Sequence, residues 1–229
     1  MKKVILSVFA VPFILAPAVM LAQTGMKPTA ATYITDEEVK TVNALPGVDR
    51  MIRVVDVGPE NFAVGVVHRG PTGGAARGAG AAAGAGAARG AGAGAGGGGR
   101  AALPPPDCGT ISTDPAVGGT GGGIAHDQQT EGYLIIGGAG TMITGGHIVN
   151  GRRSAPDGEV TKILNGPSCS GVIAGADAVR KPVKVGDIVI IPAGVPHGWA
   201  EIPDHVDYLS FRPSARVLEA GYVNPALKK

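Results

Sequence analysis

The second half of the chain alternates short apolar runs with glycine, proline, asparagine or aspartate, which is typical of short strands joined by tight turns. The runs are rich in valine and isoleucine, as in "GDIVIIP". Strands at this spacing predict an all-β sandwich or barrel. The predicted strand segments are "GYLIIGGAGTMITGG", broken into two strands at Gly137-Gly138, and then "HIVNGRR", "VTKIL", "SGVIAG", "KPVKVGDIVIIP" and "VDYLSFRP".

The region before residue 70 predicts one helix and one hairpin. Thr35 and Glu38 have the spacing of a capping box, and Pro46-Gly47 should end the helix that follows. Two β-branched runs flank "GPEN", which predicts a hairpin of strands near 51–57 and 61–68. A last helical turn is expected at 215–220.

The first 22 residues have the pattern of a secretory signal. Two lysines precede an apolar run, and small residues offer a cleavage point after Ala22. A retained anchor is the alternative, but the apolar run is short and two prolines interrupt it. We therefore expect an exported protein, periplasmic or extracellular, with residues 23–47 as a lead-in that carries the short helix and 48–225 as one barrel domain.

Charge gives no reason to expect nucleic acid or an anionic membrane as a partner. The segment 1–22 holds two of the 20 basic residues and none of the 18 acidic ones, so 18 of each remain after it. A net charge of zero gives no general attraction to phosphate-rich partners.

Residues 70–107 differ in kind from the rest of the chain. The stretch 70–100 consists mainly of glycine and alanine, and "LPPPD" follows it at 103–107. Such a composition cannot bury enough apolar surface to offset the entropy of ordering, so we expect a disordered insertion within the barrel domain. Its three arginines leave open a second interpretation, in which the insertion binds an acidic surface.

Cys108 and Cys169 are the only cysteines in the chain. Export to an oxidising compartment favours a disulfide between them over two free thiols. The pair has no C-x-x-C spacing, which argues against a zinc knuckle.

Two segments carry histidines in an ordered frame. In "GDIVIIPAGVPHGWAE", five residues separate Gly186 from Pro192-x-Gly194, and two residues separate Gly194 from His197. In "HDQQTEGYLIIGG", four residues separate His126 from Glu131, and six residues separate Glu131 from Gly138.

The two segments together resemble the two motifs of the cupin superfamily, in the family's order. The resemblance departs at two positions: Ile124 stands where the family has its first histidine, and Glu201 stands where the family often has asparagine. It implies an all-β fold, a single jelly-roll barrel, with His126, Glu131 and His197 as metal ligands.

Two imidazoles and one carboxylate suit a divalent transition metal and leave coordination positions open, without distinguishing Fe, Mn, Zn, Ni and Cu. The missing fourth ligand has three candidates: water, ranked first, Gln128 and His147. Each ligand also has a simpler interpretation, because His197 alone fits a turn residue and Glu131 alone fits an exposed strand carboxylate. Five residues could line a pocket if their side chains point into the barrel: Gln128, Tyr133, Trp199, Tyr208 and Arg212. The alternation of side chains along a strand cannot decide this from one sequence.

Three functions remain open at this level. The resemblance implies a metal-binding protein for a small molecule, and the family includes dioxygenases, decarboxylases and isomerases, among which the fold does not choose. The alternative is a metal-free module that binds a sugar or an organic acid. A third is an envelope interaction protein that acts through its Gly/Ala/Arg insertion. The resemblance also implies a homodimer, for which the hairpin at 51–68 is the candidate interface.

Overall fold

The structure is a computed structural model that describes residues 28–72, 105–113 and 120–228. The signal-like segment 1–22 and most of the Gly/Ala-rich insertion lie outside these residues. The described strands are β1 (Asp49–Asp56), β2 (Asn61–Arg69), β3 (Thr120–His126), β4 (Glu131–Thr144), β5 (His147–Arg153), β6 (Ser168–Ala174), β7 (Val179–Lys184), β8 (Ile188–Ile191), β9 (His197–Glu201) and β10 (Val206–Ser214). The helical elements are α1 (Asp36–Asn43), the π-helix η3 (Val160–Leu164) and the 3₁₀ helix η4 (Pro225–Leu227).

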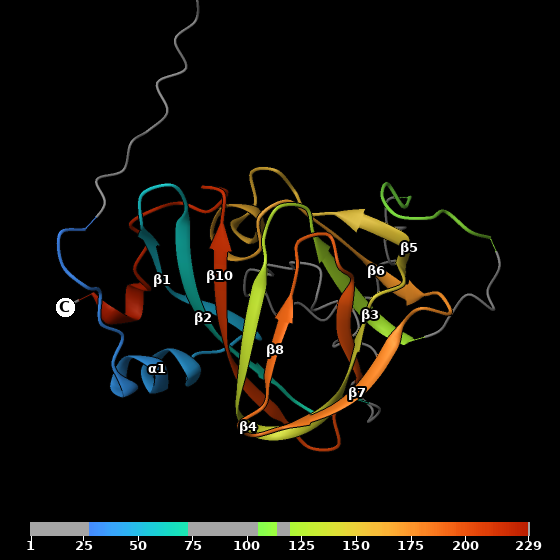
Figure 1. Ribbon diagram of the computed structural model, residues 1–229, viewed down its shortest axis with the longest axis horizontal. Helices are drawn as coiled ribbons and strands as arrows, with labels where there is room; N and C mark the ends of the chain where they lie inside the picture. Colours follow the sequence, from blue (N-terminus) through green and yellow to red (C-terminus); the bar gives the residue numbers. More distant parts are fainter. Residues whose placement is uncertain (1–27, 73–104, 114–119, 229) are drawn as a thin grey trace, which may run out of the picture.

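The strands pair antiparallel throughout and fold into two facing halves that share β4 (Figure 1). One half has the order β1-β2-β10-β4-β8. The other half has the order β7-β4-β9-β3-β6-β5. The expected all-β jelly roll is therefore confirmed by the strand pairing.

Strand β4 joins the two halves because it changes partners in its middle. Its first part, up to Gly138, pairs with β10, and its last part, from Ala139, pairs with β7. Gly138 has a φ of +63°, and a Cβ there would meet the carbonyl oxygen of His205 at 1.9 Å. Gly137-Gly138 thus marks a real discontinuity, as expected, but β4 continues across it as one strand.

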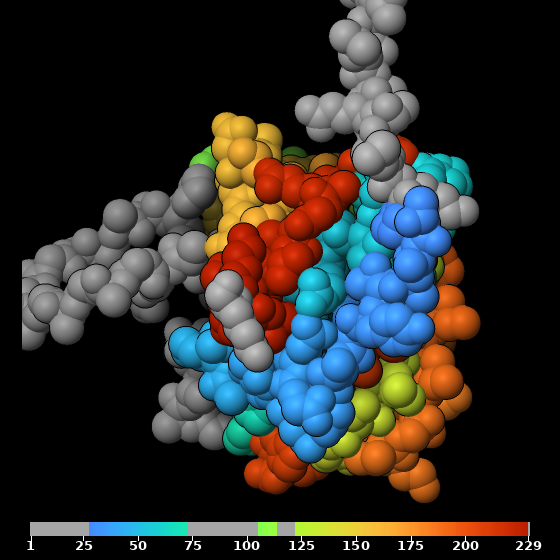
Figure 2. All heavy atoms as spheres, turned by 90° about the vertical axis from the view of Figure 1, so that its left-hand side faces the viewer, coloured from blue at the N-terminus to red at the C-terminus, as the bar shows by residue number. Residues whose placement is uncertain are grey.

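The predicted helix and hairpin are both present. Thr35 and Glu38 form the capping box, each side chain bonding to the backbone N–H of the other residue. Helix α1 packs on the outer face of β1 and β2 through Val42, which lies against Ile52 and Val66. Figure 2 shows this helix in blue and the C-terminal segment in red, lying side by side on one face of the molecule.

This packing bears on the hairpin that the sequence indicated as a dimer interface. Within the described residues, the outer edge of β1 is bridged by Val223, and α1 covers part of its outer face. Elements of the same chain therefore occupy much of that hairpin. Homodimerisation stays a prediction.

Two local predictions are wrong. The run "VTKIL" forms η3 instead of a strand, because the carbonyl of Gly158 accepts from the backbone N–H groups of Thr161 and Lys162 and begins a helical turn. A short apolar run is compatible with either structure, so its composition could not decide. No helical turn forms at 215–220: Arg216 has a φ of +59°, outside the helical region, and its side chain binds Asp56 and the carbonyl of Gly58.

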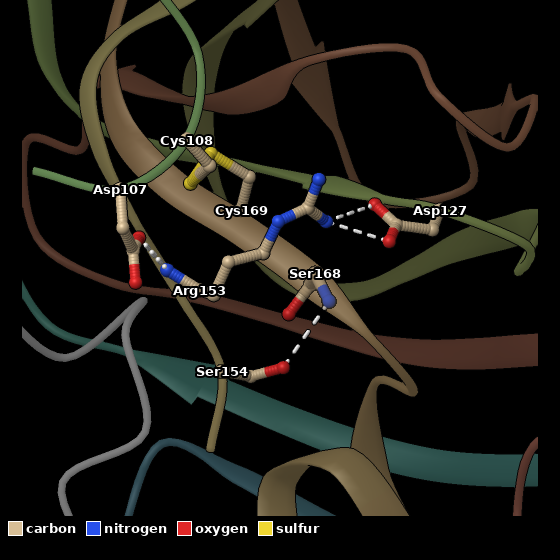
Figure 3. The surroundings of a disulfide bond; sticks show 7 residues. All are labelled: Asp107, Cys108, Asp127, Arg153, Ser154, Ser168 and Cys169. Carbon is tan, nitrogen blue, oxygen red and sulfur yellow. Dashed lines mark hydrogen bonds and ion pairs between the residues drawn. A yellow bond between two sulfur atoms is a disulfide. The ribbon is translucent and has the colours of Figure 1, made fainter. Parts of the chain in front are cut away.

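Cys108 and Cys169 form the expected disulfide (Figure 3). Cys169 lies on β6 beside β3, where it pairs with Ala125. Close to the bond, Arg153 donates two hydrogen bonds to Asp127, at 2.7 and 2.6 Å, and its backbone N–H donates to Asp107. The bond thus ties the segment around residue 108 to the sheet that carries β3.

The helices in the described part of the chain are all too short or too polar to cross a membrane.

Candidate metal centre

Three strands place the predicted ligands at one end of the barrel interior. His126 ends β3, Glu131 begins β4 and His197 begins β9. Strands β3 and β9 are neighbours, with Ile124 paired to His197, and the N–H of Gly194 donates to the carbonyl of His126 at 2.7 Å. The Pro-Gly turn before His197 is therefore docked on the end of β3, which brings two segments about 70 residues apart together.

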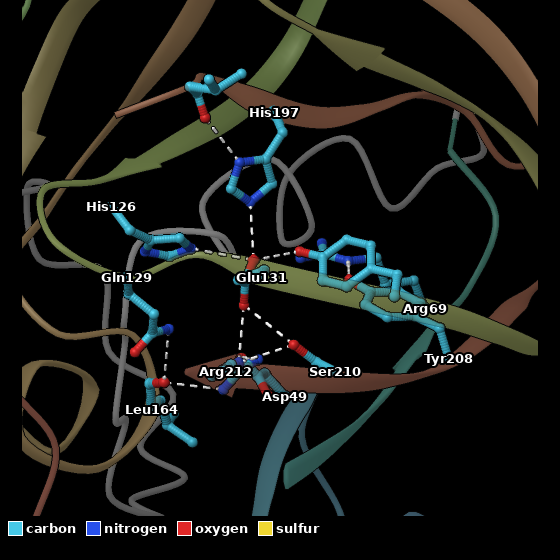
Figure 4. Close-up of polar contacts among 12 residues, drawn as sticks. Asp49, Arg69, His126, Gln129, Glu131, Leu164, His197, Tyr208, Ser210 and Arg212 are labelled. Atoms are coloured by element: carbon cyan, nitrogen blue, oxygen red, sulfur yellow. Dashed lines mark hydrogen bonds and ion pairs between the residues drawn. The ribbon is translucent and has the colours of Figure 1, made fainter. Parts of the chain in front are cut away.

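The side chains of the three residues converge (Figure 4). Nε2 of His126 lies 3.2 Å from Oε2 of Glu131, and Nε2 of His197 lies 3.1 Å from the same oxygen. Each residue offers one ligand atom, and these atoms all lie within 4.8 Å of one another. The three side chains are at most 3% exposed. They form a buried His–Glu–His set of the kind the resemblance implied.

A backbone contact fixes the orientation of His197. Its Nδ1 lies 3.0 Å from the carbonyl oxygen of Val195. Because a carbonyl can only accept, Nδ1 carries a proton, and in the neutral tautomer Nε2 presents its lone pair. That lone pair faces the carboxylate of Glu131, and Nε2 makes no hydrogen bond. Two electron-rich atoms at this separation need a cation near them, either a proton on the imidazole or a metal ion.

Glu131 accepts hydrogen bonds from three side chains within the described residues. Oε1 accepts from Nε of Arg212 at 2.7 Å and from the hydroxyl of Ser210 at 3.1 Å. Oε2 accepts from the hydroxyl of Tyr133 at 2.6 Å and lies within reach of His126. Burial raises the pKa of Glu131, but the adjacent His126 and Arg212 outweigh it and hold the pKa well below its usual range. The carboxylate is therefore charged and has a fixed orientation.

Arg212 was expected to contact a substrate, but the structure gives its guanidinium other partners. Besides Glu131, it donates to Asp49 at 2.7 Å and to the carbonyl of Leu164 at 2.9 Å, and the residue is only 1% exposed. All three of its nitrogens are thus committed to the protein. Arg212 positions Glu131 and has no nitrogen left for a ligand.

Three other pocket candidates do line the interior. The rings of Tyr133 and Tyr208 have centroids 4.3 Å apart, and the ring of Trp199 lies 5.8 Å from that of Tyr208. Burial and the charge of Glu131 raise the pKa of Tyr133 well above its usual value, so its hydroxyl stays a donor. These three rings form an apolar wall beside the His–Glu–His set.

The two protein candidates for a fourth ligand do not reach the site. Gln128 is exposed in the turn between β3 and β4, and the neighbouring Gln129 takes the buried position instead. His147 is exposed at the start of β5. Ile124 is buried, and Glu201 is exposed. Among the residues weighed from the sequence, this leaves three protein ligands and water as the remaining candidate.

Several residues of the site were not found from the sequence. Asp49, Arg69, Gln129 and Ser210 all belong to the polar network of Figure 4. Strand β10 carried a usable signal, since Tyr208, Ser210 and Arg212 alternate with more exposed residues and face one side. Asp49 and Arg69 had no comparable signal, because each lies at the end of its strand.

The donor set fits a transition metal. Two atoms that each lie about 2.1 Å from one ion, at roughly 90–110° to each other, are about 3.0–3.4 Å apart. The separations of 3.1 and 3.2 Å around Oε2 of Glu131 fall in this range. The lone pair of His197 Nε2 supplies the unprotonated nitrogen that metal binding requires.

Comparisons with known proteins give only distant likenesses. No family model matches the chain, and no curated protein matches it. A solved structure of an uncharacterised conserved protein with a double-stranded β-helix domain, from Klebsiella pneumoniae, is 14% identical over 82% of this chain and 93% of that one, with a TM-score of 0.34. Peruvianin-I, a cysteine peptidase from Thevetia peruviana latex, is 11% identical over 80% of this chain and 77% of that one, with a TM-score of 0.30. A domain of Drosophila melanogaster CENP-C is 9% identical over 71% of this chain and 72% of that one, with a TM-score of 0.28. At these scores the likeness assigns nothing by itself, and the cupin-type fold rests on the strand pairing and the His–Glu–His set of the chain itself.

Proposed function

We propose that this protein is an exported cupin-type barrel that holds one divalent transition metal through His126, Glu131 and His197 and binds a small molecule beside it. The observation that carries the proposal is the orientation of His197. Its Nδ1 is committed to the carbonyl of Val195, so its other ring nitrogen, Nε2, faces a buried carboxylate oxygen 3.1 Å away. A metal bound there would coordinate both the unprotonated Nε2 and this oxygen.

The residues around the set support this role. Arg212 and Ser210 hold Oε1 of Glu131, and Tyr133 holds Oε2, so the carboxylate is oriented before any ion binds. Tyr133, Trp199 and Tyr208 exclude water from one side of the site. A bound metal would supply Lewis acidity, polarising an oxygen of the bound molecule.

Export is part of the proposal. The disulfide between Cys108 and Cys169 supports it, because such bonds persist in oxidising compartments and are rare in the cytosol. The signal-like pattern of residues 1–22 is the sequence argument for the same conclusion.

Elemental analysis of the purified chain tests the metal site. We expect about one transition-metal ion per chain in the wild type and loss of most of it in His197→Ala, because a three-ligand site that loses an imidazole retains little affinity. His147→Ala is the matched control, since it removes an exposed histidine and should leave the metal content unchanged. A wild type that stays metal-free after incubation with Fe, Mn, Zn, Ni and Cu salts, while its near-UV spectrum shows an intact barrel, would refute the proposal.

One observation favours a metal-free binding module as the second candidate. Glu131 is already satisfied by its three donors, and the position of the missing fourth ligand is filled by the buried Ile124. The network can therefore stand as a structural charge cluster. Ligand binding that is unchanged by a strong chelator would support this second function, and binding that is lost with the metal would support the first.

A further inference from the structure

Arg69 is the cation of the barrel interior that the metal site does not use. It ends β2, pairs across the sheet with Val206 of β10, and shares the inward face of β2 with Val67. Within the described residues its one hydrogen-bond partner is the hydroxyl of Tyr208, to which Nε donates at 3.3 Å. Its two terminal nitrogens make no hydrogen bond or ion pair there, and the residue is partly exposed.

The contrast with Arg212 makes this unusual. Arg212 lies in the same network, and each of its nitrogens binds a carboxylate, a hydroxyl or a carbonyl of the protein. A guanidinium carries five N–H donors in a rigid fork that matches a carboxylate. Within the described residues, Arg69 has the two terminal nitrogens of that fork unpaired at the edge of an aromatic wall.

Arg69 is next to the His–Glu–His set through an unbroken series of contacts. Nε of Arg69 bonds to Tyr208, the Tyr208 ring lies 4.3 Å from the ring of Tyr133, and the Tyr133 hydroxyl bonds to Glu131 at 2.6 Å. Figure 4 shows Arg69 and Tyr208 together on one side of Glu131. A small molecule that packed along these two rings would reach Arg69 at one end and the His–Glu–His set at the other.

The backbone around Arg69 is fixed before any ligand binds. Thr72 exchanges two hydrogen bonds with Ile202, its N–H donating to the carbonyl at 2.9 Å and its hydroxyl accepting from the N–H at 2.7 Å. These bonds hold the end of β2 against the loop before β10. The backbone that carries Arg69 is therefore preorganised, and the bond from Nε to Tyr208 restricts its side chain, which lowers the entropy cost of binding an anion.

The charge balance of the site also favours an anion. Glu131 and Asp49 carry two negative charges, which Arg212 and Arg69 offset, and the histidines are neutral when they bind a metal. Burial lowers the pKa of Arg69, but the nearby Tyr208, Tyr133 and Asp49 outweigh it and raise the pKa, so this guanidinium is charged. A divalent cation then leaves the interior with excess positive charge, which a negatively charged ligand would neutralise.

We infer that the small molecule bound by this barrel is a carboxylate, and that Arg69 is the residue that binds its carboxyl group. This inference rests on the proposed function, since the remaining part of the molecule would lie at the His–Glu–His set. A charged guanidinium at this place favours small organic acids as the ligand class over neutral sugars.

Tryptophan fluorescence can test the inference, because Trp199 is the only tryptophan and its ring lies 5.8 Å from that of Tyr208, the partner of Arg69. The probe is malonate, with malonamide as its uncharged counterpart. We expect malonate to change the fluorescence of the wild type saturably and malonamide to bind at least tenfold more weakly. Arg69→Gln should weaken malonate binding at least tenfold, and Arg69→Lys should restore part of the loss, because lysine keeps the charge without the fork.

Arg180→Gln is the matched control, since it removes the same charge from an exposed position on β7 and should bind malonate as the wild type does. Metal content, measured on each variant, separates the two proposals. A metal-loaded wild type that binds malonate and malonamide equally, or an Arg69→Gln variant that binds malonate undiminished, overturns the inference and leaves the metal site standing. Malonate binding that depends on Arg69 in a metal-free wild type upholds the inference while the metal site fails.

Discussion

Glu131 keeps its negative charge at 1% exposure because donors from β4 and β10 surround its two oxygens. Such a buried charge is costly unless it is paired and hydrogen-bonded, and here Arg212 supplies the opposite charge. The arrangement also turns one oxygen toward the two imidazoles. At the residue scale, the site is therefore as much the work of the supporting side chains as of the three ligands.

Tyr133→Phe tests that support. It removes the hydroxyl that donates to Oε2 of Glu131 at 2.6 Å and keeps the ring that packs on Tyr208. We expect a folded protein whose metal affinity is about 10–100-fold lower, the usual effect of losing a hydrogen bond to a ligating group. Competition with a fluorescent chelator measures it. Tyr222→Phe makes the same change beside the separate Met51 cluster and should have no effect, and a Tyr133→Phe affinity within twofold of wild type would count against the role assigned to Tyr133.

The three ligand positions were predicted from the resemblance to the two cupin motifs, each of which is a local run of residues. His126 and Glu131 lie across one tight connection, and His197 follows a Pro-Gly turn. Arg69, Asp49 and Ser210 were not predictable in the same way, since each reaches the site from a strand whose register depends on distant partners. Gln128 and Gln129 show the limit most plainly: a shift of one residue in a turn decides which amide is buried.

At the scale of elements, β4 determines the shape of the molecule. It begins at Glu131 in one half of the fold and ends at Thr144 in the other. The candidate ligand Glu131 therefore lies on the strand that joins the two halves. The change of partners occurs where two glycines allow a close approach to β10 and the loop before it. A side chain at this point would interfere directly with closure.

Gly138→Ala should therefore be strongly destabilising. A Cβ at this position would meet the carbonyl oxygen of His205 at 1.9 Å and would also impose a strained positive φ. We expect a loss of about 2–4 kcal/mol in the free energy of unfolding, which urea denaturation measures. Gly186→Ala is the control, because its φ is also positive but no atom lies within 4 Å of its Cβ position, so about 1–2 kcal/mol is expected. Equal losses in the two variants would mean that closure at Gly138 tolerates a side chain.

The error at "VTKIL" belongs to the same scale. Valine, threonine and isoleucine favour strands, but the turn at Gly158 starts a helical segment whose Ile163 and Leu164 pack against the cluster around Met51. Tertiary packing decided between two structures that the composition allowed.

At the scale of the whole molecule, the disulfide links two segments that are far apart in the sequence. Cys108 and Cys169 lie 61 residues apart, and the bond joins the segment after the insertion to β6. The surrounding cluster is small, with Ile143, Ile148 and Ile173 as its other buried members.

Removal of the disulfide should thus lower stability substantially. For the double variant Cys108→Ala/Cys169→Ala we expect a loss of about 4 kcal/mol in the free energy of unfolding, from the loop entropy that the bond removes from the unfolded chain. Urea denaturation of the wild type with and without a reductant should show a comparable difference. The reductant should not change the double variant, and a reduced wild type as stable as the oxidised one would contradict this account.

The sequence by itself determined what depends on neighbouring residues: the strand-rich character, the capped helix, the hairpin around "GPEN", and a histidine and a glutamate at opposite ends of one short turn. These follow from local backbone preferences and from the alternation of apolar positions. Only the tertiary structure decided that Arg212 and Asp49 complete the charge network, that Arg69 bonds to Tyr208 beside it, and that β4 belongs to both halves of the barrel. The first two features join residues 81 to 163 positions apart. The register between distant strands is set by packing of the whole interior, which no local pattern encodes.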